Sequence, residues 1–570
     1  MSQQPAYSPA DLVLRAGAVY QVNAARSWAQ SVAVRDGVIV AVGADAEVAG
    51  LIGPGTEVVD LGGRMLLPGF IDAHVHASGA GLERRQCDLA PVHGRDDYLA
   101  LIRQYAQDRP DVAWITGGGW AMDVFPGGVP SRHDLDRIVP DRPVFLSNRD
   151  HHAAWVNTRA LEAAGVTAST PDPADGRIER EPDGSPAGTL QEGAMGLVQQ
   201  IVPRPSVAEQ VDGIVEGQRY LHGLGITGWQ EAIVGDYAVV PDCFDAYLEA
   251  DRLGLLTGRV VGALWWQRGR GPEQLPSLIE RRQRAGHQGR FRATSIKIMQ
   301  DGVCENFTAS MLAPYLDRHG HQTASAGHSF FDPAELRESV TAIDAAGFQV
   351  HFHAIGDRAV REALDAVAAA RAANGAMKRA GQVGGGRHHI AHIQVIHPED
   401  LPRFRDLDVA ANCQALWACE EPQMTELTLP FLGPVRAAWQ YPFGSLARSG
   451  AQLCMGSDWP VSSPDPLWQM HVAVNRTVPP GYPYAPAGSG TSPFLPPERI
   501  TLPDALAAFT IGSAYVNHAD HVSGSIEPGK AADLVVLDRN LFARPVEEIA
   551  LARVDLTFAS GRLVHDRSAT

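Results

Sequence analysis

The chain has 570 residues, of which 45% are hydrophobic and 20% charged, and this composition excludes a largely disordered protein. Its formal net charge of −17 argues against nucleic acid and anionic membranes as partners, because a polyanion is repelled unless a dense basic face is present. The sequence has no run of about 18 apolar residues, no basic and apolar leader and no CxxC spacing among its six cysteines, so we expect a cytoplasmic protein with reduced thiols.

Alternating apolar and polar residues at both ends of the chain predict short β-strands joined by Gly and Asp turns. The N-terminal end contains "SVAVRDGVIVAVG", and the C-terminal end contains "KAADLVVLDRN" and "VDLTFASGRLVHD". Two separate β fragments would each expose a sheet edge. We therefore expect the two ends, residues 1–67 and 516–570, to meet in one small discontinuous β-sandwich.

Between these ends, apolar runs alternate with helical patterns, as is typical of β/α units on a parallel sheet. The runs are "GFIDAHVH", "GITGWQEA", "GRVVGALWW", "ATSIKIMQDG", "FQVHFHAIG", "HHIAHIQVI", "DVAANCQAL" and "AQLCMGSDWPV". Eight such strands close a TIM barrel. The sequence thus predicts an α/β protein whose residues 68–515 form a TIM (β/α)8 barrel.

The connection between the first and second runs is far too long for an ordinary βα loop. We expect an insertion subdomain over residues 78–224, with strands in "AWITGGGW" and "RPVFLSN" and a hairpin around "GRIEREPDGSPAG". It begins directly after the first barrel strand, at the end where TIM barrels hold their active sites. The insertion is therefore predicted to form a wall or lid over the site.

His74 and His76 stand two residues apart at the end of the first run, so both side chains point into one space. Two such histidines alone are more often core or surface residues than metal ligands. The corresponding ends of other runs, however, carry further residues that can ligate a metal: Lys297, His353, His392 and Asp458. Buried lysine and aspartate are costly unless paired or coordinated, and the whole set therefore predicts a metal centre.

Together with their neighbours, these motifs resemble the metal-dependent amidohydrolase superfamily, and within it the YtcJ-like branch that includes N-substituted formamide deformylases. The similarity extends over nearly the whole chain, through "LPGFIDAHVH", "WITGGGW", "PVFLSNRDHHAAWVNTRAL", "GTLQEGA", "KIMQDG", "HFHAIGDRAV", "AHIQVI", "GSDWPV" and "GSIEPGKAADLVVLD". The resemblance implies hydrolysis of a non-peptide carbon–nitrogen bond in a small molecule, a linear amide or an N-substituted formamide. Members of this family often form homodimers, so the resemblance also implies a homodimer.

The resemblance also implies a binuclear centre of two divalent metal ions, with Zn²⁺ as the leading candidate. His74 and His76 would hold the more buried ion, and His353 and His392 the more exposed one. A CO2-derived carbamate on Lys297 would bridge both, because an ammonium group cannot ligate a cation whereas a carbamate offers two anionic oxygens. Asp458 would coordinate the buried ion and carry the proton of a metal-bridging hydroxide, so Lys297 and Asp458 are the expected catalytic residues.

Two rival enzymatic functions stay open within the same superfamily, hydrolysis of a cyclic amide and deamination of a ring. A mononuclear deaminase needs a glutamate acid near the fifth strand and has no bridging lysine. Here the fifth strand reads "HFHAIGD", which contains no glutamate, and Lys297 is present, so the sequence disfavours a deaminase. A third alternative, from a different class, is a non-catalytic barrel that serves as a scaffold. Such a protein need not retain Lys297 and Asp458 together.

Several aromatic and imidazole side chains are candidates for a substrate pocket with an apolar face and polar handles; they are Trp120, His151, His152, Trp417 and Trp459. His351 is expected to pack deeper in the barrel than His353, and Asp72 to support the end of the first strand. His388 and His389 are expected at the rim of the barrel. Glu192, in "LQEGA", falls at a recurrent position of the insertion, and the sequence assigns it no task.

Overall fold

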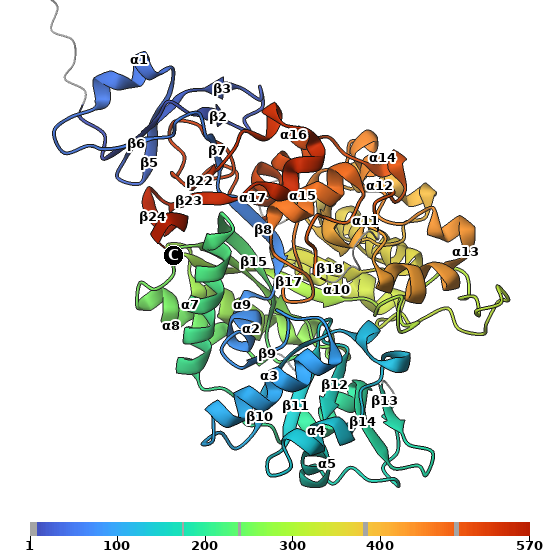
Figure 1. Cartoon of the computed structure of the whole chain (residues 1–570). Helices are drawn as coiled ribbons and strands as arrows, with labels where there is room; N and C mark the ends of the chain where they lie inside the picture. The colour runs from blue at the N-terminus through green and yellow to red at the C-terminus, as the bar shows by residue number, and fades with distance from the viewer. Residues whose placement is uncertain (1–7, 174–175, 238–240, 380–385, 484–489, 570) are drawn as a thin grey trace, which may run out of the picture.

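The computed structural model describes the chain except for residues 1–7, 174–175, 238–240, 380–385, 484–489 and 570. Figure 1 shows a central α/β body, a β-rich body at the upper left that contains both the first and the last strands, and an insertion at the bottom. The insertion and the terminal strands therefore lie on opposite sides of the central body.

Eight parallel strands form the central sheet, and its two edge strands, β8 and β21, contact each other. The strands are β8 (Phe70–Val75), β15 (Ile226–Val234), β16 (Arg259–Trp265), β17 (Phe291–Met299), β18 (Gln349–Ala354), β19 (His389–His392), β20 (Ala410–Cys413) and β21 (Leu453–Met455). At the carboxyl ends of these two strands, the backbone N–H of Asp458 donates to the carbonyl of His74 (2.7 Å). The backbone N–H of His76 donates to the carbonyl of Trp459 (2.9 Å). The predicted eight-stranded parallel barrel is confirmed as a nearly closed one.

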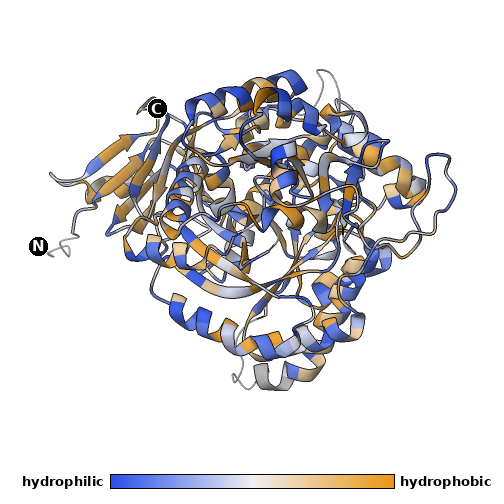
Figure 2. Ribbon diagram, turned by 90° about the horizontal axis from the view of Figure 1, so that it is seen from below, coloured by the Kyte–Doolittle hydropathy of each residue, from blue (hydrophilic) through white to orange (hydrophobic). Residues whose placement is uncertain are grey.

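Helices that follow the strands cover the outside of the barrel. They include α8 (Phe244–Arg252), α9 (Leu275–Ala285), α10 (Pro333–Ala345), α11 (Asp357–Arg379), α12 (Leu401–Asp406), α14 (Phe443–Ser449) and α15 (Pro466–Asn475). In α11, Val360, Leu364 and Val367 recur at helical spacing and are wholly buried in the main core. Figure 2 shows hydrophilic and hydrophobic stretches side by side on the outer helices, as expected when one face packs on the sheet.

The insertion lies between two helices that pack tightly together, α2 (Ala77–Glu83) and α7 (Val207–Gly223). A Cβ atom at Gly81 would lie 2.0 Å from the carbonyl oxygen of Gly213, so only glycine permits this approach. The insertion's own sheet has six strands in the order β13-β14-β12-β11-β10-β9. They are β9 (Cys87–Asp88), β10 (Ile115–Trp120), β11 (Val144–Asn148), β12 (Ala153–Val156), β13 (Gly176–Arg180) and β14 (Pro186–Glu192).

Strands from both ends of the chain share one core. A four-stranded sheet contains β1 (Leu12–Arg15), β4 (Ser31–Arg35), β5 (Val38–Gly43) and β6 (Glu57–Asp60). A six-stranded sheet contains β2 (Ala18–Tyr20), β3 (Trp28–Ala29), β7 (Met65–Pro68), β22 (Leu534–Leu537), β23 (Val554–Ala559) and β24 (Arg562–Asp566). β22 pairs antiparallel with β7, and Val34, Leu66 and Phe558 meet in the core between the sheets.

All six cysteines are buried and form no disulfide. Within the part of the chain that the structure describes, every helix is too short or too polar to cross a membrane.

Candidate metal centre

Two imidazoles and a carboxylate converge at the carboxyl end of the barrel. His74 is the penultimate residue of β8, and His76 directly follows the strand. The Nε2 atoms of both lie 3.0 Å from Oδ1 of Asp458. Ligand atoms of His74, His392 and Asp458 all lie within 4.8 Å of one another. Imidazole nitrogens and a carboxylate oxygen at such separations can surround one divalent cation.

Asp458 reaches this position through a strained local backbone. Its φ of 58° lies in the left-handed region, which a residue other than glycine occupies only when its surroundings hold it there. The buried carboxylate of Asp72 supplies part of that support, since it accepts hydrogen bonds from His74 N–H (3.0 Å) and from the hydroxyl of Ser457 (2.6 Å). Asp72 thus ties the end of β8 to the segment after β21, as predicted for a supporting residue.

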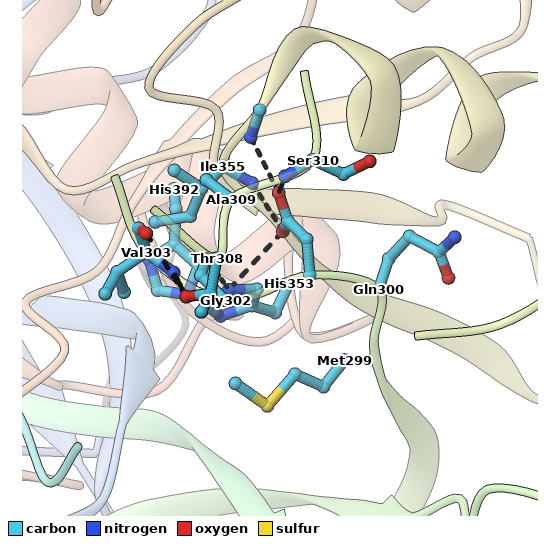
Figure 3. A network of polar contacts seen from close by, with 12 residues as sticks. Met299, Gln300, Gly302, Val303, Thr308, Ala309, Ser310, His353, Ile355 and His392 are labelled. Atoms are coloured by element: carbon cyan, nitrogen blue, oxygen red, sulfur yellow. Dashed lines mark hydrogen bonds and ion pairs between the residues drawn. The ribbon is translucent and has the colours of Figure 1, made fainter. Parts of the chain in front are cut away.

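His353 in β18 and His392 in β19 add two more imidazoles to this cluster from the opposite side of the barrel. The ring centroid of His392 lies 4.7 Å from that of His74 and 4.4 Å from that of His353. Figure 3 shows His353 beside Gly302, and its Nε2 lies 3.2 Å from that carbonyl oxygen. Because a carbonyl can only accept, Nε2 of His353 carries the proton, and the lone pair on Nδ1 is left for a metal.

Lys297 projects from β17 into the same space. Its side chain is 2% exposed, and burial lowers the pKa of its amine to about 7. A large share of the amine is then uncharged at neutral pH, which is the form that can react with CO2. All six predicted metal ligands line one cavity of about 510 Å³.

The buried histidines are neutral and can offer lone pairs. Burial, with a smaller contribution from Lys297, lowers the pKa of His74 to about 3, and burial also holds the pKa values of His353 and His392 well below the ordinary value. Burial by itself raises the pKa of Asp458, but His74 and His76 outweigh it and keep that pKa well below its usual range. The centre therefore combines the neutral imidazoles of His74, His353 and His392 with an ionised carboxylate at neutral pH.

Behind the centre, a buried polar network orients His74. Nε2 of His351 lies 2.7 Å from Nδ1 of His74, so His351 sits deeper than the row of candidate ligands, as predicted. The prediction that His388 and His389 lie at the rim is wrong, because they are only 3% and 0% exposed. His389 begins β19 and contacts Gln230 (2.9 Å) inside the barrel. The sequence contained no signal that Gln230 contacts His389, because no local pattern distinguishes a buried glutamine from an exposed one.

The insertion supplies one wall of the cavity through the turn between β11 and β12. His151 and His152 from this turn line the cavity, and Trp417 lines it from the barrel side, stacked on His392 with ring centroids 5.3 Å apart. Nε2 of His151 lies 3.3 Å from a carboxyl oxygen of Glu83. Burial raises the pKa of Glu83 to about 8 and lowers that of His151 to about 4, so this pair is neutral near pH 7.

Trp120 and Trp459 do not line the cavity, and the prediction that they would is corrected. Trp120 is 0% exposed inside the insertion, where its Nε1–H donates to the carbonyl of Leu146 (2.9 Å). Trp459 packs against Tyr220, with ring centroids 5.1 Å apart. A tryptophan satisfies a core as well as a pocket, and its partners in both cases come from distant parts of the chain.

We expect Trp120→Ala to lower the free energy of unfolding by about 3–5 kcal/mol, because the change removes a fully buried ring and leaves a cavity. Denaturant-induced unfolding of the two proteins measures this difference. Phe307→Ala is a suitable control, since Phe307 is 37% exposed. An unchanged stability of Trp120→Ala would contradict the core position of this ring.

Comparison with known proteins reveals similarity over most of the chain. The sequence profile of the Amidohydrolase family matches residues 57–565. The chain is 32% identical to protein LONG AFTER FAR-RED 3 of Arabidopsis thaliana, over 98% of this chain and 92% of that protein. It is 28% identical to the putative amidohydrolase YtcJ of Bacillus subtilis, over 97% and 99% of the two chains, and 27% identical to the N-substituted formamide deformylase of Arthrobacter pascens, over 98% and 99%.

A similar fold occurs in a solved structure, an uncharacterized metal-dependent hydrolase from Pyrococcus furiosus. The two share 25% sequence identity and a TM-score of 0.69, and the match covers 93% of this chain and 99% of that one. The match therefore extends over most of both chains.

Proposed function

Since this chain belongs to the amidohydrolase family and is a metal-dependent hydrolase of that family, we propose that it cleaves a non-peptide carbon–nitrogen bond in a small linear amide. The observation that carries the proposal is the convergence of His74 and His76 on one oxygen of Asp458 inside a cavity of small-molecule size. Similarity to the deformylase of Arthrobacter pascens makes N-substituted formamides the first substrates to test.

The donor set fits two divalent cations, with Zn²⁺ first among them. The neutral imidazoles offer lone pairs, and Asp458 offers a carboxylate oxygen, which together are ligands that zinc accepts. His74, His76 and Asp458 would hold one ion, and His353 and His392 the other. Lys297, as a carbamate formed with CO2, would bridge them, and the low pKa of its buried amine supports that modification.

Cations bound here would polarise the substrate carbonyl and make a water molecule more acidic. Asp458 accepts the proton of that water as the water oxygen bonds to the carbonyl carbon. It then delivers the proton to the nitrogen as the carbon–nitrogen bond breaks. The products are an amine and a carboxylic acid, which is formic acid when the substrate is a formamide. The depressed pKa of Asp458 keeps it ionised and able to accept this proton.

We expect the protein to bind about two zinc equivalents per chain and to release an amine and formate from N-substituted formamides. Elemental analysis measures the metal, and product analysis with a panel of amides, lactams and aminopurines measures the reaction. His74→Ala should lose metal, whereas His397→Ala should keep it, because His397 does not line the cavity.

Three outcomes contradict the proposal. A chain without metal after expression in metal-supplemented medium supports the scaffold alternative. Opening of lactam rings without cleavage of linear amides supports the cyclic amidase. Release of ammonia from ring amino groups supports the deaminase.

A further inference from the structure

Glu192 makes a specific contact with His152 at the edge of the cavity. It is the last residue of β14 and has φ 48° and ψ −128°, a backbone conformation that residues other than glycine rarely adopt. Its two carboxylate oxygens lie 3.0 and 2.9 Å from Nδ1 of His152, and Asn306 donates to one of them (3.3 Å). Because an ionised carboxylate can only accept, Nδ1 of His152 carries a proton.

The other ring nitrogen of His152 is left for a ligand. The backbone holds the residue in place, since its N–H donates to Asp150 (3.0 Å) and its carbonyl accepts from the N–H of Glu192 (2.9 Å). The side chain lines the same cavity as the six predicted metal ligands and is 13% exposed. Among the residues that the structure describes, none forms a hydrogen bond with Nε2 of His152.

Protonation of the His152 ring makes Nε2 a hydrogen-bond donor, because both nitrogens of an imidazolium carry a proton. Burial by itself lowers the pKa of His152, but the charge and hydrogen bond of Glu192 outweigh it and raise that pKa to about 9. The pKa of Glu192 is correspondingly lowered by His152, despite burial. The other titratable or charged groups that influence this pair are Asp150, Glu305, His151, His353 and Arg268. His152 is thus an imidazolium at neutral pH, while the adjacent His151 is neutral.

We propose that Glu192 is a positioning residue that holds His152 with its Nε2–H directed into the cavity, where it binds a substrate oxygen that carries or acquires negative charge. The inference rests on the proposed hydrolytic function and deepens it. Such an oxygen has two sources: a carboxylate already present on the substrate, or the amide oxygen as it becomes an oxyanion during attack. A charged donor in a buried site favours both over neutral water.

The first test follows the His152 ring itself in metal-free protein. NMR titration should place its pKa near 9 in the wild type, clearly lower in Glu192→Gln, and close to the wild-type value in Glu192→Asp, which restores the charge. Addition of acetate should perturb the Nε2 signal of the wild type but not that of Glu192→Gln. This readout needs no turnover, so it remains valid if the proposed hydrolysis fails. Equal titration curves and equal acetate responses in the wild type and Glu192→Gln overturn the inference.

The second test is kinetic and separates the two sources of the oxygen. If His152 binds the oxyanion, Glu192→Gln should lower kcat about a hundredfold, leave KM unchanged, and move the alkaline limb of the pH profile to lower pH. If it binds a substrate carboxylate, KM should rise for carboxylate-bearing amides and not for their neutral analogues. Unchanged kcat and KM for every substrate overturn the inference.

Two further variants control for general damage. Asp344→Asn removes the charge from a buried carboxylate–imidazole contact of the same kind, because Asp344 lies 2.9 Å from Nε2 of His388 and does not line the cavity. Its activity per folded molecule should equal that of the wild type, and a loss like that of Glu192→Gln would indicate a structural role. If Glu192→Gln does not fold, Asn306→Ala provides a milder test. It removes the hydrogen bond that Asn306 donates to Glu192, and its kinetic effects should be smaller than those of Glu192→Gln but in the same direction. The double variant Glu192→Gln/His152→Gln should be no worse than His152→Gln, and additive losses overturn the inference.

Discussion

Asp458→Asn is expected to lower kcat by a factor of about 10²–10⁴ while most of the metal remains bound. The amide oxygen can still lie between His74 and His76, 3.0 Å from each in the native carboxylate, but the uncharged group cannot accept the proton of the attacking water. Amine release measures kcat, and elemental analysis of the same sample measures the metal.

Asp357→Asn is the matched control for this change. Asp357 is also buried and also follows a barrel strand, but it accepts a hydrogen bond from the N–H of Leu312 (2.8 Å) and does not line the cavity. Its variant should retain wild-type kcat per folded molecule. Near-wild-type turnover of Asp458→Asn would remove Asp458 from the mechanism, and an equal loss in both variants would indicate general destabilisation.

Lys297→Ala is expected to lose at least about a hundredfold in activity, because it removes the proposed bridge between the two metal ions, and loss of such an anion costs several kcal/mol of transition-state stabilisation. A short carboxylic acid such as propionic acid should restore part of the activity, since its carboxylate can occupy the place of the proposed carbamate. Activity measured against acid concentration, with metal content at each point, tests both expectations.

Lys530→Ala is the control, since Lys530 lies outside the cavity and donates to the carbonyl of Asp520 (2.6 Å). It should keep its metal and its activity with or without added acid. A fully active Lys297→Ala protein would mean that this lysine is an ordinary buried residue, and mass spectrometry of the native protein should then find no added CO2.

The barrel and its candidate ligands could be predicted because their signals are local. In a strand, residues two apart share a face, so "HVH" places His74 and His76 on one side wherever the strand lies. Parallel strands end at the same edge of a barrel, so a ligand-type residue at each end, such as His353 or His392, brings distant positions together without knowledge of any contact.

The pocket walls could not be predicted in the same way. Trp120 and Trp459 were expected beside the substrate, yet each packs against partners from other segments, Leu146 and Tyr220. Trp417 does line the cavity. Nothing in the neighbouring sequence distinguishes these rings, because burial of a large side chain stabilises a core and a pocket alike.

The sequence by itself determined the strand periodicity, the eight-stranded barrel and the positions of chemically capable side chains, since backbone sterics and side-chain alternation act over a few residues. Only the tertiary structure decided protonation states and partners. Glu192 meets His152 because β14 and β12 are neighbours in the insertion's sheet, although the two residues are 40 positions apart in the chain. That contact makes His152 a cation, whereas His151, one residue earlier, faces Glu83 and stays neutral. The charge of a buried group depends on desolvation and on charges a few ångströms away, and folding alone brings these together.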